Sequence, residues 1–172
     1  MTLKSTLLPP STIRFERLLP GPVERVWAYL TESDKRATWL AAGEFELRLG
    51  GRIEMVCDNE LLSDEPRPDD ATCNKGKVVT GTITRYEPMK ALAHTWQAPG
   101  LDAEVLYELT PKGRDVLLVI HHRVPQDRAM QVGVGGGWGA HTGILEDVLN
   151  GVKPRGFWST HAQLMKEFAA AN

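Results

Sequence analysis

Four strand-like stretches follow one another in the middle of this 172-residue chain, and only short breaks separate them. Each break contains a proline or a glycine, which are residues typical of turns. Connections this short join antiparallel neighbours, because parallel strands need crossovers of a dozen or more residues. The sequence therefore predicts an antiparallel sheet. The stretches are residues 76–86, 91–97, 103–109 and 115–122.

A further strand and two short helices are expected before these stretches. Residues 11–19 are predicted to form a strand, which the Pro-Gly-Pro sequence at 20–22 ends. Apolar residues at helical spacing then predict one helix over residues 23–30 and a second over 31–40, with Ser33 as the N-cap. Two short helices are thus expected to interrupt the strands.

The region after residue 43 changes to a period of two. Apolar and charged residues alternate up to the Gly50-Gly51 pair, which is a turn signal, and a second alternating run follows. This pattern predicts a β-hairpin. The apolar positions are Phe45, Leu47, Leu49, Ile53, Met55 and Cys57.

Residues 58–75 form an acidic stretch with little periodicity. This stretch holds six acidic residues and two prolines, and it is longer than most loops of a compact domain. We expect disorder or a mobile flap here. Calcium binding is a weaker alternative, because the acidic residues lack the ligand spacing and central glycine of a known calcium loop.

A long helix is predicted over about residues 138–149, after a glycine cluster at 133–139 that is interpreted as a flexible entry. Its apolar stripe contains an indole and an imidazole, which suit either a cavity wall or a core with paired polar groups. Residues 153–156 resemble a linker before a terminal helix, whose aromatic residues suit core or dimer contacts. The stripe of the long helix is Trp138, His141, Leu145 and Val148, and that of the terminal helix is Trp158, His161, Met165 and Phe168.

The composition argues against several classes of partner. A formal net charge of −2 gives no basic surface for nucleic acid. Cys57 and Cys73 have no CxxC spacing, so free thiols are expected. Residues 1–12 lack the apolar run of a signal peptide, and no segment reaches the roughly 20 apolar residues of a membrane helix. A cytoplasmic protein that binds neither nucleic acid nor membrane is therefore expected.

The order of these elements and several short motifs resemble the helix-grip, or START-like, fold of bacterial homologues of the activator of the heat-shock-protein-90 ATPase. The resemblance implies an α+β domain over residues 12–151, in which a curved antiparallel sheet of six or seven strands wraps around the long helix. Residues 1–11 and 152–172 would then be N-terminal and C-terminal extensions. The motifs are Pro22-Val23-Glu24-Arg25-Val26-Trp27, Thr38-Trp39-Leu40, Leu47-Arg48-Leu49-Gly50-Gly51-Arg52, Gly81-Thr82-Ile83-Thr84 with Glu87-Pro88, His94-Thr95-Trp96, Tyr107-Glu108-Leu109-Thr110-Pro111 and Gly137-Trp138 with His141 and Leu145.

A gap between such a sheet and its helix would form a pocket with mostly apolar walls and a few polar groups, as small-molecule sites have. The period of two places three sets of strand residues on the inner face: Leu92, His94 and Trp96; Val105, Tyr107 and Leu109; and Leu117, Val119 and His121. The predicted ligand-binding residues are Trp39, Phe45, Met55, His94, Trp96, Tyr107, His121, Trp138, His141 and Leu145.

Binding of a hydrophobic or amphipathic small molecule is the leading hypothesis, without a cofactor or a metal. The sequence has no HExxH pair and no Gly-x-Ser-x-Gly motif, which argues against catalysis. Two alternatives stay open. The first is a cyclase or hydrolase that uses one of the histidines with Tyr107 or Glu104. The second, implied by the family resemblance alone, is stimulation of a chaperone ATPase through a surface contact.

Overall fold

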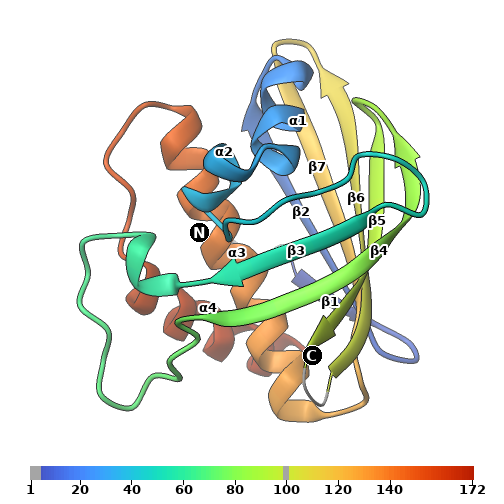
Figure 1. Ribbon diagram of the computed structural model, residues 1–172. Coiled ribbons are helices and arrows are strands. Elements are labelled where there is room, and N and C mark those ends of the chain that lie inside the picture. The colour runs from blue at the N-terminus through green and yellow to red at the C-terminus, as the bar shows by residue number, and fades with distance from the viewer. Residues whose placement is uncertain (1–4, 99–100) are drawn as a thin grey trace.

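The computed structural model describes residues 5–98 and 101–172. Within them, one sheet of seven antiparallel strands has the order β1-β2-β7-β6-β5-β4-β3, with a single pairing irregularity between β4 and β5. The sheet curves strongly, so that β3 and β4 lie across from β2 and β7 (Figure 1). The strands are β1 (Ser5–Leu8), β2 (Thr12–Pro20), β3 (Arg52–Cys57), β4 (Lys77–Glu87), β5 (Ala91–Ala98), β6 (Leu101–Lys112) and β7 (Asp115–Arg123).

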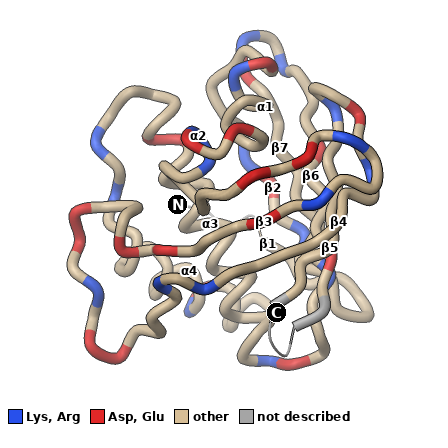
Figure 2. The backbone as a smooth tube through the Cα atoms, in the orientation of Figure 1, with Lys and Arg blue, Asp and Glu red and all other residues tan. Residues whose placement is uncertain are grey.

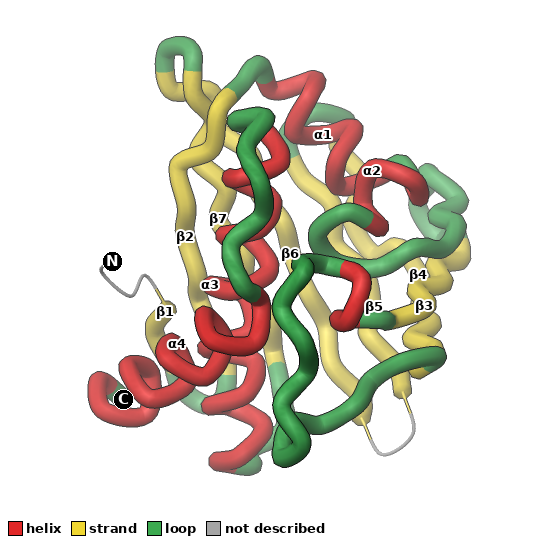
Figure 3. The backbone as a smooth tube through the Cα atoms, turned by 90° about the vertical axis from the view of Figure 1, so that its left-hand side faces the viewer, coloured by secondary structure: helices red, strands yellow, loops and turns green. Residues whose placement is uncertain are grey.

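The long helix α3 lies inside the curve of this sheet, and α4 packs across α3 (Figures 1 and 3). This arrangement confirms the predicted α+β helix-grip fold. None of the helices in the described part of the chain is both long and apolar enough to cross a membrane. The helices are α1 (Val23–Thr31), α2 (Ser33–Ala37), the 3-10 turn η1 (Asn59–Leu61), α3 (Arg128–Leu149) and α4 (Phe157–Ala171).

The predicted strands over residues 11–19, 76–86, 91–97, 103–109 and 115–122 all form. The additional strand β1 lies in the stretch that was expected to be an N-terminal extension, and it pairs with the outer edge of β2. The hydroxyl of Ser5 also donates to the carbonyl oxygen of Gly135 in α3, at 2.7 Å. The four residues of β1, two polar and two leucines, are too few to show an alternating pattern, and an edge strand can be very short.

The inner face predicted for β7 is wrong by one residue. Leu118, Ile120 and His122 are buried, whereas His121 points outward and has its Nδ1 3.8 Å from a carboxylate oxygen of Glu108. The sequence Val-Leu-Leu-Val-Ile at 116–120 is apolar throughout, so alternation could not define the face. Strand pairing defines it instead, because Ile120 lies opposite Tyr107 of β6.

The predicted hairpin at residues 43–57 forms only in its second half. β3 is a regular strand, but residues 43–49 contribute only one isolated bridge, between Phe45 and Ile53. Leu47 and Leu49 are 38% and 68% exposed. The backbone N–H of Arg48 donates to the carbonyl of Glu46, which makes a tight turn and prevents a continuous ladder.

The start of α3 also differs from the prediction. The helix begins at Arg128, where the side chain of Asp127 accepts a hydrogen bond from the Met130 N–H. The glycine cluster therefore lies within the helix and not before it. The reason is the close approach of α4: a Cβ atom at Gly135 would lie 2.5 Å from the ring of Phe168, and one at Gly139 would lie 2.5 Å from Leu164.

The acidic segment 58–75 is held by specific contacts, contrary to the expected disorder. Leu62 is buried in the core, and Arg67 forms an ion pair with Glu60 at 2.9 Å. The backbone N–H groups of Phe157 and Ser159, at the start of α4, donate to side-chain oxygens of Ser63 and Glu65 in this segment. In the view of Figure 2, charged residues of both signs are spread over this segment, the other loops and the strands.

Candidate functional site

A cavity of about 420 Å³ lies between the sheet, α3 and the start of α4. Its walls come from the chain after α2, from β3, β4, β5 and β7, from both ends of the acidic segment, and from one side of both long helices. Most of the lining is apolar, and Lys77 is the one charged residue of the wall. The lining residues are Leu40, Ala41, Met55, Cys57, Asn59, Asn74, Lys77, Val79, Trp96, His122, Met130, Gly133, Val134, Gly137, Trp138, His141, Phe157 and His161.

Four of the ten predicted ligand-binding residues line this cavity, namely Met55, Trp96, Trp138 and His141. The other six lie elsewhere. Leu145 is fully buried in the core, and His121 is on the outer face of the sheet. Phe45, His94 and Tyr107 pack on one another in the core beside the cavity, with His94 5.5 Å from Phe45 and 5.8 Å from Tyr107 between ring centroids.

Trp39, the sixth of these residues, supports the wall from behind. Its side chain is fully buried, and its indole N–H donates to the carbonyl of Tyr29 at 2.8 Å. Its own carbonyl oxygen accepts a hydrogen bond from Nδ1 of His141 at 2.9 Å. Trp39 therefore fixes the orientation of a lining imidazole without reaching the cavity itself.

Arg36 holds the chain that leads into the wall at Leu40 and Ala41. Its guanidinium is buried, and it donates to the carbonyl oxygens of Leu30, Thr31, Ala41 and Gly43. It also lies 3.7 Å from the centroid of the Phe45 ring. Burial lowers the pKa of Arg36 to about 10, so the side chain stays charged at neutral pH. The predicted N-cap role of Ser33 is wrong: its hydroxyl accepts from the Gly43 N–H instead, at 2.9 Å, and Glu32 occupies the cap position.

Two groups stand out among the lining residues that sequence reasoning missed. The first comes from segments assigned to turns or disorder, such as Asn59 and Asn74, and carried no usable signal. The second could have been found. Met130, Gly133, Val134 and Gly137 continue the stripe of Trp138 and His141 backwards at helical spacing, provided that the glycines are accepted as helical.

Three aromatic rings form one wall of the cavity. The indole N–H of Trp138 donates to Nδ1 of His122, with 3.1 Å between the nitrogen atoms. Trp96 contacts both rings, with centroid separations of 5.1 Å to His122 and 6.1 Å to Trp138. Burial lowers the pKa of His122 to about 3, so its imidazole is neutral at physiological pH.

Two further imidazoles line the side formed by the helices. His141 has a pKa lowered to about 4 by burial, and burial also lowers the pKa of His161. His161 uses its Nε2–H to donate to the carbonyl of Gly133 at 3.2 Å. Phe157 contacts both, with ring centroids 4.9 Å from His141 and 5.6 Å from His161. These histidines therefore add polar atoms to the wall without adding charge.

Two lining residues carry a buried side-chain atom with no hydrogen-bond partner among the described residues. These atoms are Nε2 of His122 and Oδ1 of Asn59. Buried polar atoms are normally paired, because an unpaired one keeps the full cost of its removal from water. Each of these two atoms thus lacks, within the described part of the chain, the hydrogen-bond partner that a buried polar atom normally has.

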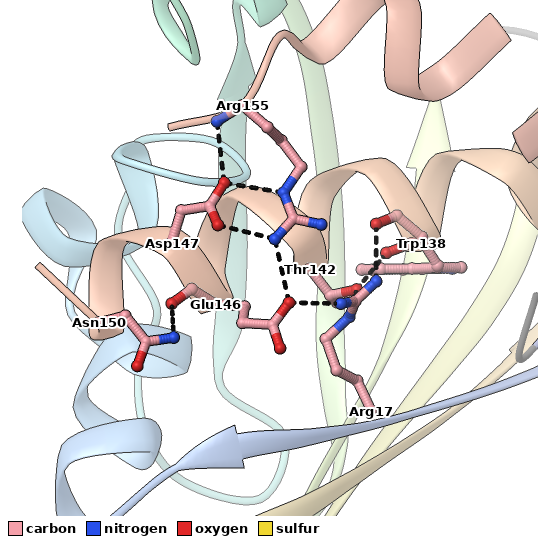
Figure 4. Close-up of polar contacts among 8 residues, drawn as sticks. Arg17, Trp138, Thr142, Glu146, Asp147, Asn150 and Arg155 are labelled. Carbon is pink, nitrogen blue, oxygen red and sulfur yellow. Dashed lines mark hydrogen bonds and ion pairs between the residues drawn. The ribbon is translucent and has the colours of Figure 1, made fainter. Parts of the chain in front are cut away.

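The position of α3 over the sheet is fixed by a charged network (Figure 4). Arg17 of β2 donates to Thr142 at 3.0 Å and to the carboxylate of Glu146 at 2.7 Å. Arg155, between the two long helices, donates to the same carboxylate at 3.0 Å and to both oxygens of Asp147. Burial raises the pKa of Asp147, but hydrogen bonds from Arg155 outweigh this effect, and the net shift is downward. The network holds the half of α3 that follows Trp138 against β2 and against the segment before α4.

The residues considered for catalysis do not meet in the cavity. Tyr107 is buried below the wall, and burial raises the pKa of its phenol far above neutral pH. Glu104 precedes the inward-facing Val105 and so points to the opposite face of β6. Within residues 5–98 and 101–172, no group of three or more histidine, cysteine and acidic side chains is arranged to hold a metal ion.

Comparison with solved structures supports the fold. A Bordetella parapertussis protein whose structure was determined by NMR is 40% identical, with a TM-score of 0.79 over 98% of this chain and 94% of that chain. CalU16 from Micromonospora echinospora is 22% identical, with a TM-score of 0.71 over 98% of this chain and 94% of its own. DynU16, described as encoded in the dynemicin biosynthetic locus, is 20% identical, with a TM-score of 0.65 over 85% of this chain and 49% of its own.

No curated protein is similar enough to this sequence to count as a match. A family model matches residues 20–150, which run from the last residue of β2 to just past the end of α3 and include most of the cavity wall. With the arrangement of sheet and helices, this match shows that the chain belongs to the family of Activator of Hsp90 ATPase homolog 1-like proteins.

Proposed function

We propose that this protein binds a hydrophobic or amphipathic small molecule in the cavity between the sheet and α3. The observation that carries the proposal is the cavity itself, about 420 Å³ in volume, with a mostly apolar wall and a few polar atoms. Small-molecule sites in proteins have about 300–1,000 Å³ and this kind of lining.

The electrostatics of the wall favour a guest whose buried part is uncharged. His122 and His141 are neutral at physiological pH, and burial raises the pKa of the Cys57 thiol, so that Cys57 is protonated as well. Lys77, the charged lining residue, is exposed and lies at the rim. An apolar body inside with a polar group towards Lys77 fits this distribution of charge.

The two indoles of the wall provide a direct readout of binding. A ligand that enters the cavity contacts Trp96 and Trp138, so it should change their fluorescence, and it should raise the melting temperature by mass action. Titration with 1-anilinonaphthalene-8-sulfonate, followed by competition with naphthalene derivatives and fatty acids, tests both effects. At a ligand concentration of 100 times Kd, the expected gain in the free energy of unfolding is about 2.7 kcal/mol.

A cavity-filling variant separates the cavity from other apolar surfaces. Gly137 lines the cavity, and a Cβ atom there would meet only Nε2 of His161, at 3.9 Å. Gly137→Leu should fill part of the space and weaken binding at least tenfold, whereas Gly137→Ala should bind nearly as the wild type does. Equal affinity in the wild type and Gly137→Leu would place the bound molecule elsewhere and contradict the proposal.

A further inference from the structure

The hydrogen bond between Trp138 and His122 determines where the proton of His122 sits. An indole nitrogen can only donate, so Nδ1 of His122, 3.1 Å away, must be the acceptor and carries no hydrogen. A histidine ring that is unprotonated at Nδ1 carries its hydrogen at Nε2. His122 therefore has an Nε2–H donor, and its tautomer is defined by its neighbour.

This donor has no acceptor among the described residues. Nε2 of His122 is buried, and the ring lies against the indoles of Trp96 and Trp138, which offer no lone pair. The imidazole of His94 also acts on His122, but its Nε2 likewise has no hydrogen-bond partner within these residues, so the two nitrogens do not bind each other. The same side chain lines the cavity. An acceptor for this N–H is therefore best supplied by a molecule that occupies the cavity.

We infer that the cavity selects ligands that carry a neutral carbonyl-type oxygen; this inference rests on the small-molecule binding proposed above. The oxygen accepts a hydrogen bond from the Nε2–H of His122, on the wall that His122 forms with Trp96 and Trp138. Ketones, quinones, esters and amides belong to this class.

A neutral oxygen fits better than a carboxylate for a reason of charge. The rings around His122 are uncharged aromatic groups, and a buried anion without a cationic partner is costly. Lys77, the cation of the lining, belongs to the exposed end of the cavity. A carbonyl oxygen accepts one hydrogen bond from a neutral donor without bringing a net charge into the wall.

A pair of ligands with matched shapes tests this inference directly. 2-Acetylnaphthalene and 2-isopropenylnaphthalene differ in one position, where a carbonyl oxygen replaces a CH₂ group, so their apolar contacts are nearly equal. Equilibrium dialysis against the wild-type protein should give about tenfold tighter binding of the ketone, after correction for the different transfer of the two compounds from water to cyclohexane.

Two variants of His122 separate the donor from the contact with Trp138. In His122→Asn, Oδ1 takes the place of Nδ1 and can still accept from Trp138, but the group at Nε2 is missing. In His122→Gln, the amide nitrogen takes the place of Nε2 and keeps a donor, while the acceptor for Trp138 is lost. The preference for the ketone should therefore disappear in His122→Asn and persist in His122→Gln. Melting curves establish that both variants are folded.

The outcomes distinguish this inference from the proposed function. Equal affinity of the two compounds for the wild type, or a ketone preference that survives in His122→Asn, overturns the selection by His122 but leaves cavity binding intact. Binding of neither compound, and no response to any ligand of the wider panel, overturns both. A preference that follows the donor, present in the wild type and His122→Gln only, supports the inference.

Discussion

The backbone nitrogen of Met165 in α4 lies so close to Gly136 in α3 that a Cβ atom built at Gly136 would come within 2.7 Å of it. Real Cβ contacts are not this short, and a backbone atom cannot move aside as a flexible side chain can. One residue further along α3, Gly137 faces the cavity, with Nε2 of His161 as its nearest neighbour at 3.9 Å. Two adjacent glycines in one helix thus have opposite structural roles.

Alanine at these two positions should change stability in opposite directions. Gly136→Ala is expected to lower the free energy of unfolding by roughly 1–3 kcal/mol, because it separates the two helices. Gly137→Ala is expected to raise it by up to about 1 kcal/mol, because alanine favours the helical backbone and meets no obstacle. Urea denaturation measures both, and a loss of similar size in both variants would contradict the packing described here.

The ion pair between Arg17 and Glu146 should be worth far more than another pair on the same strand. Arg17→Met is expected to destabilise the protein by roughly 1–3 kcal/mol, because it removes the donor to Thr142 and one of the two partly buried guanidinium groups that bind Glu146. Arg14 pairs with Glu16 at a similar distance, 3.0 Å, but both of these side chains are more than a third exposed. Arg14→Met should therefore change stability by less than about 0.5 kcal/mol in the same denaturation experiment.

Arg36→Lys should be strongly destabilising although the charge is conserved. A lysine ammonium is a point donor and cannot reach the spread of carbonyl oxygens that the guanidinium of Arg36 contacts, from Leu30 to Gly43. We expect a loss of roughly 2–4 kcal/mol by chemical denaturation. Arg25→Lys, on the exposed side of α1, is the matched control and should stay within about 0.5 kcal/mol of the wild type.

Stability should fall as the pH is lowered from about 6.5 to about 4, because of the buried histidines. Burial lowers the pKa of His94 and His141 to about 4 and that of His122 to about 3, whereas an unfolded histidine titrates near 6.5. Below pH 6.5 the unfolded chain therefore binds protons that the native protein does not, which favours unfolding. Each such histidine contributes a slope of up to about 1.4 kcal/mol per pH unit.

Urea denaturation at a series of pH values checks this expectation. His122→Asn should reduce the slope by about the contribution of one histidine, since one protonation site of the unfolded chain is removed. A free energy of unfolding that stays constant from pH 7 to pH 5 in the wild type would show that these imidazoles are accessible to protons in the native state.

The regular part of the sheet could be predicted from the sequence because turn residues and short connections define it locally. β4, β5 and β6 have Gly or Pro at their boundaries, and α1 has its apolar residues at helical spacing. These signals depend on a few neighbouring residues and do not require knowledge of the rest of the fold. The face of β7 could not be read in this way, because His122 rather than His121 is brought inward by pairing with β2 and β6.

The glycines of α3 were misread for a related reason. Glycine disfavours the helix in isolation, and only contact with α4, which lies more than twenty residues later, makes small residues favourable at Gly135 and Gly139. The predicted stripe of Trp138 and His141 was sound, but its continuation to Met130 depended on this contact. This part of the cavity wall is thus determined by tertiary packing and not by local periodicity.

The long acidic segment was misjudged because its partners are distant in the chain. Ser63 and Glu65 bind backbone groups 94 residues away, and no local pattern reports such a contact. Its low hydrophobicity is real, yet Leu62 is buried in the core and Ala71 packs against the core.

Those same hydrogen bonds have a consequence for the way the chain assembles. The N-cap of α4 is Gly156, which has no side chain to satisfy the first N–H groups of the helix, so Ser63 and Glu65 do this from outside. We therefore expect the terminal helix to be poorly formed as a free peptide and to acquire its first turn late, once β3 and β4 have brought the acidic segment into place. Cleavage by a protease within residues 58–75 would then loosen the first turn of α4, although α4 lies more than 80 residues later in the chain.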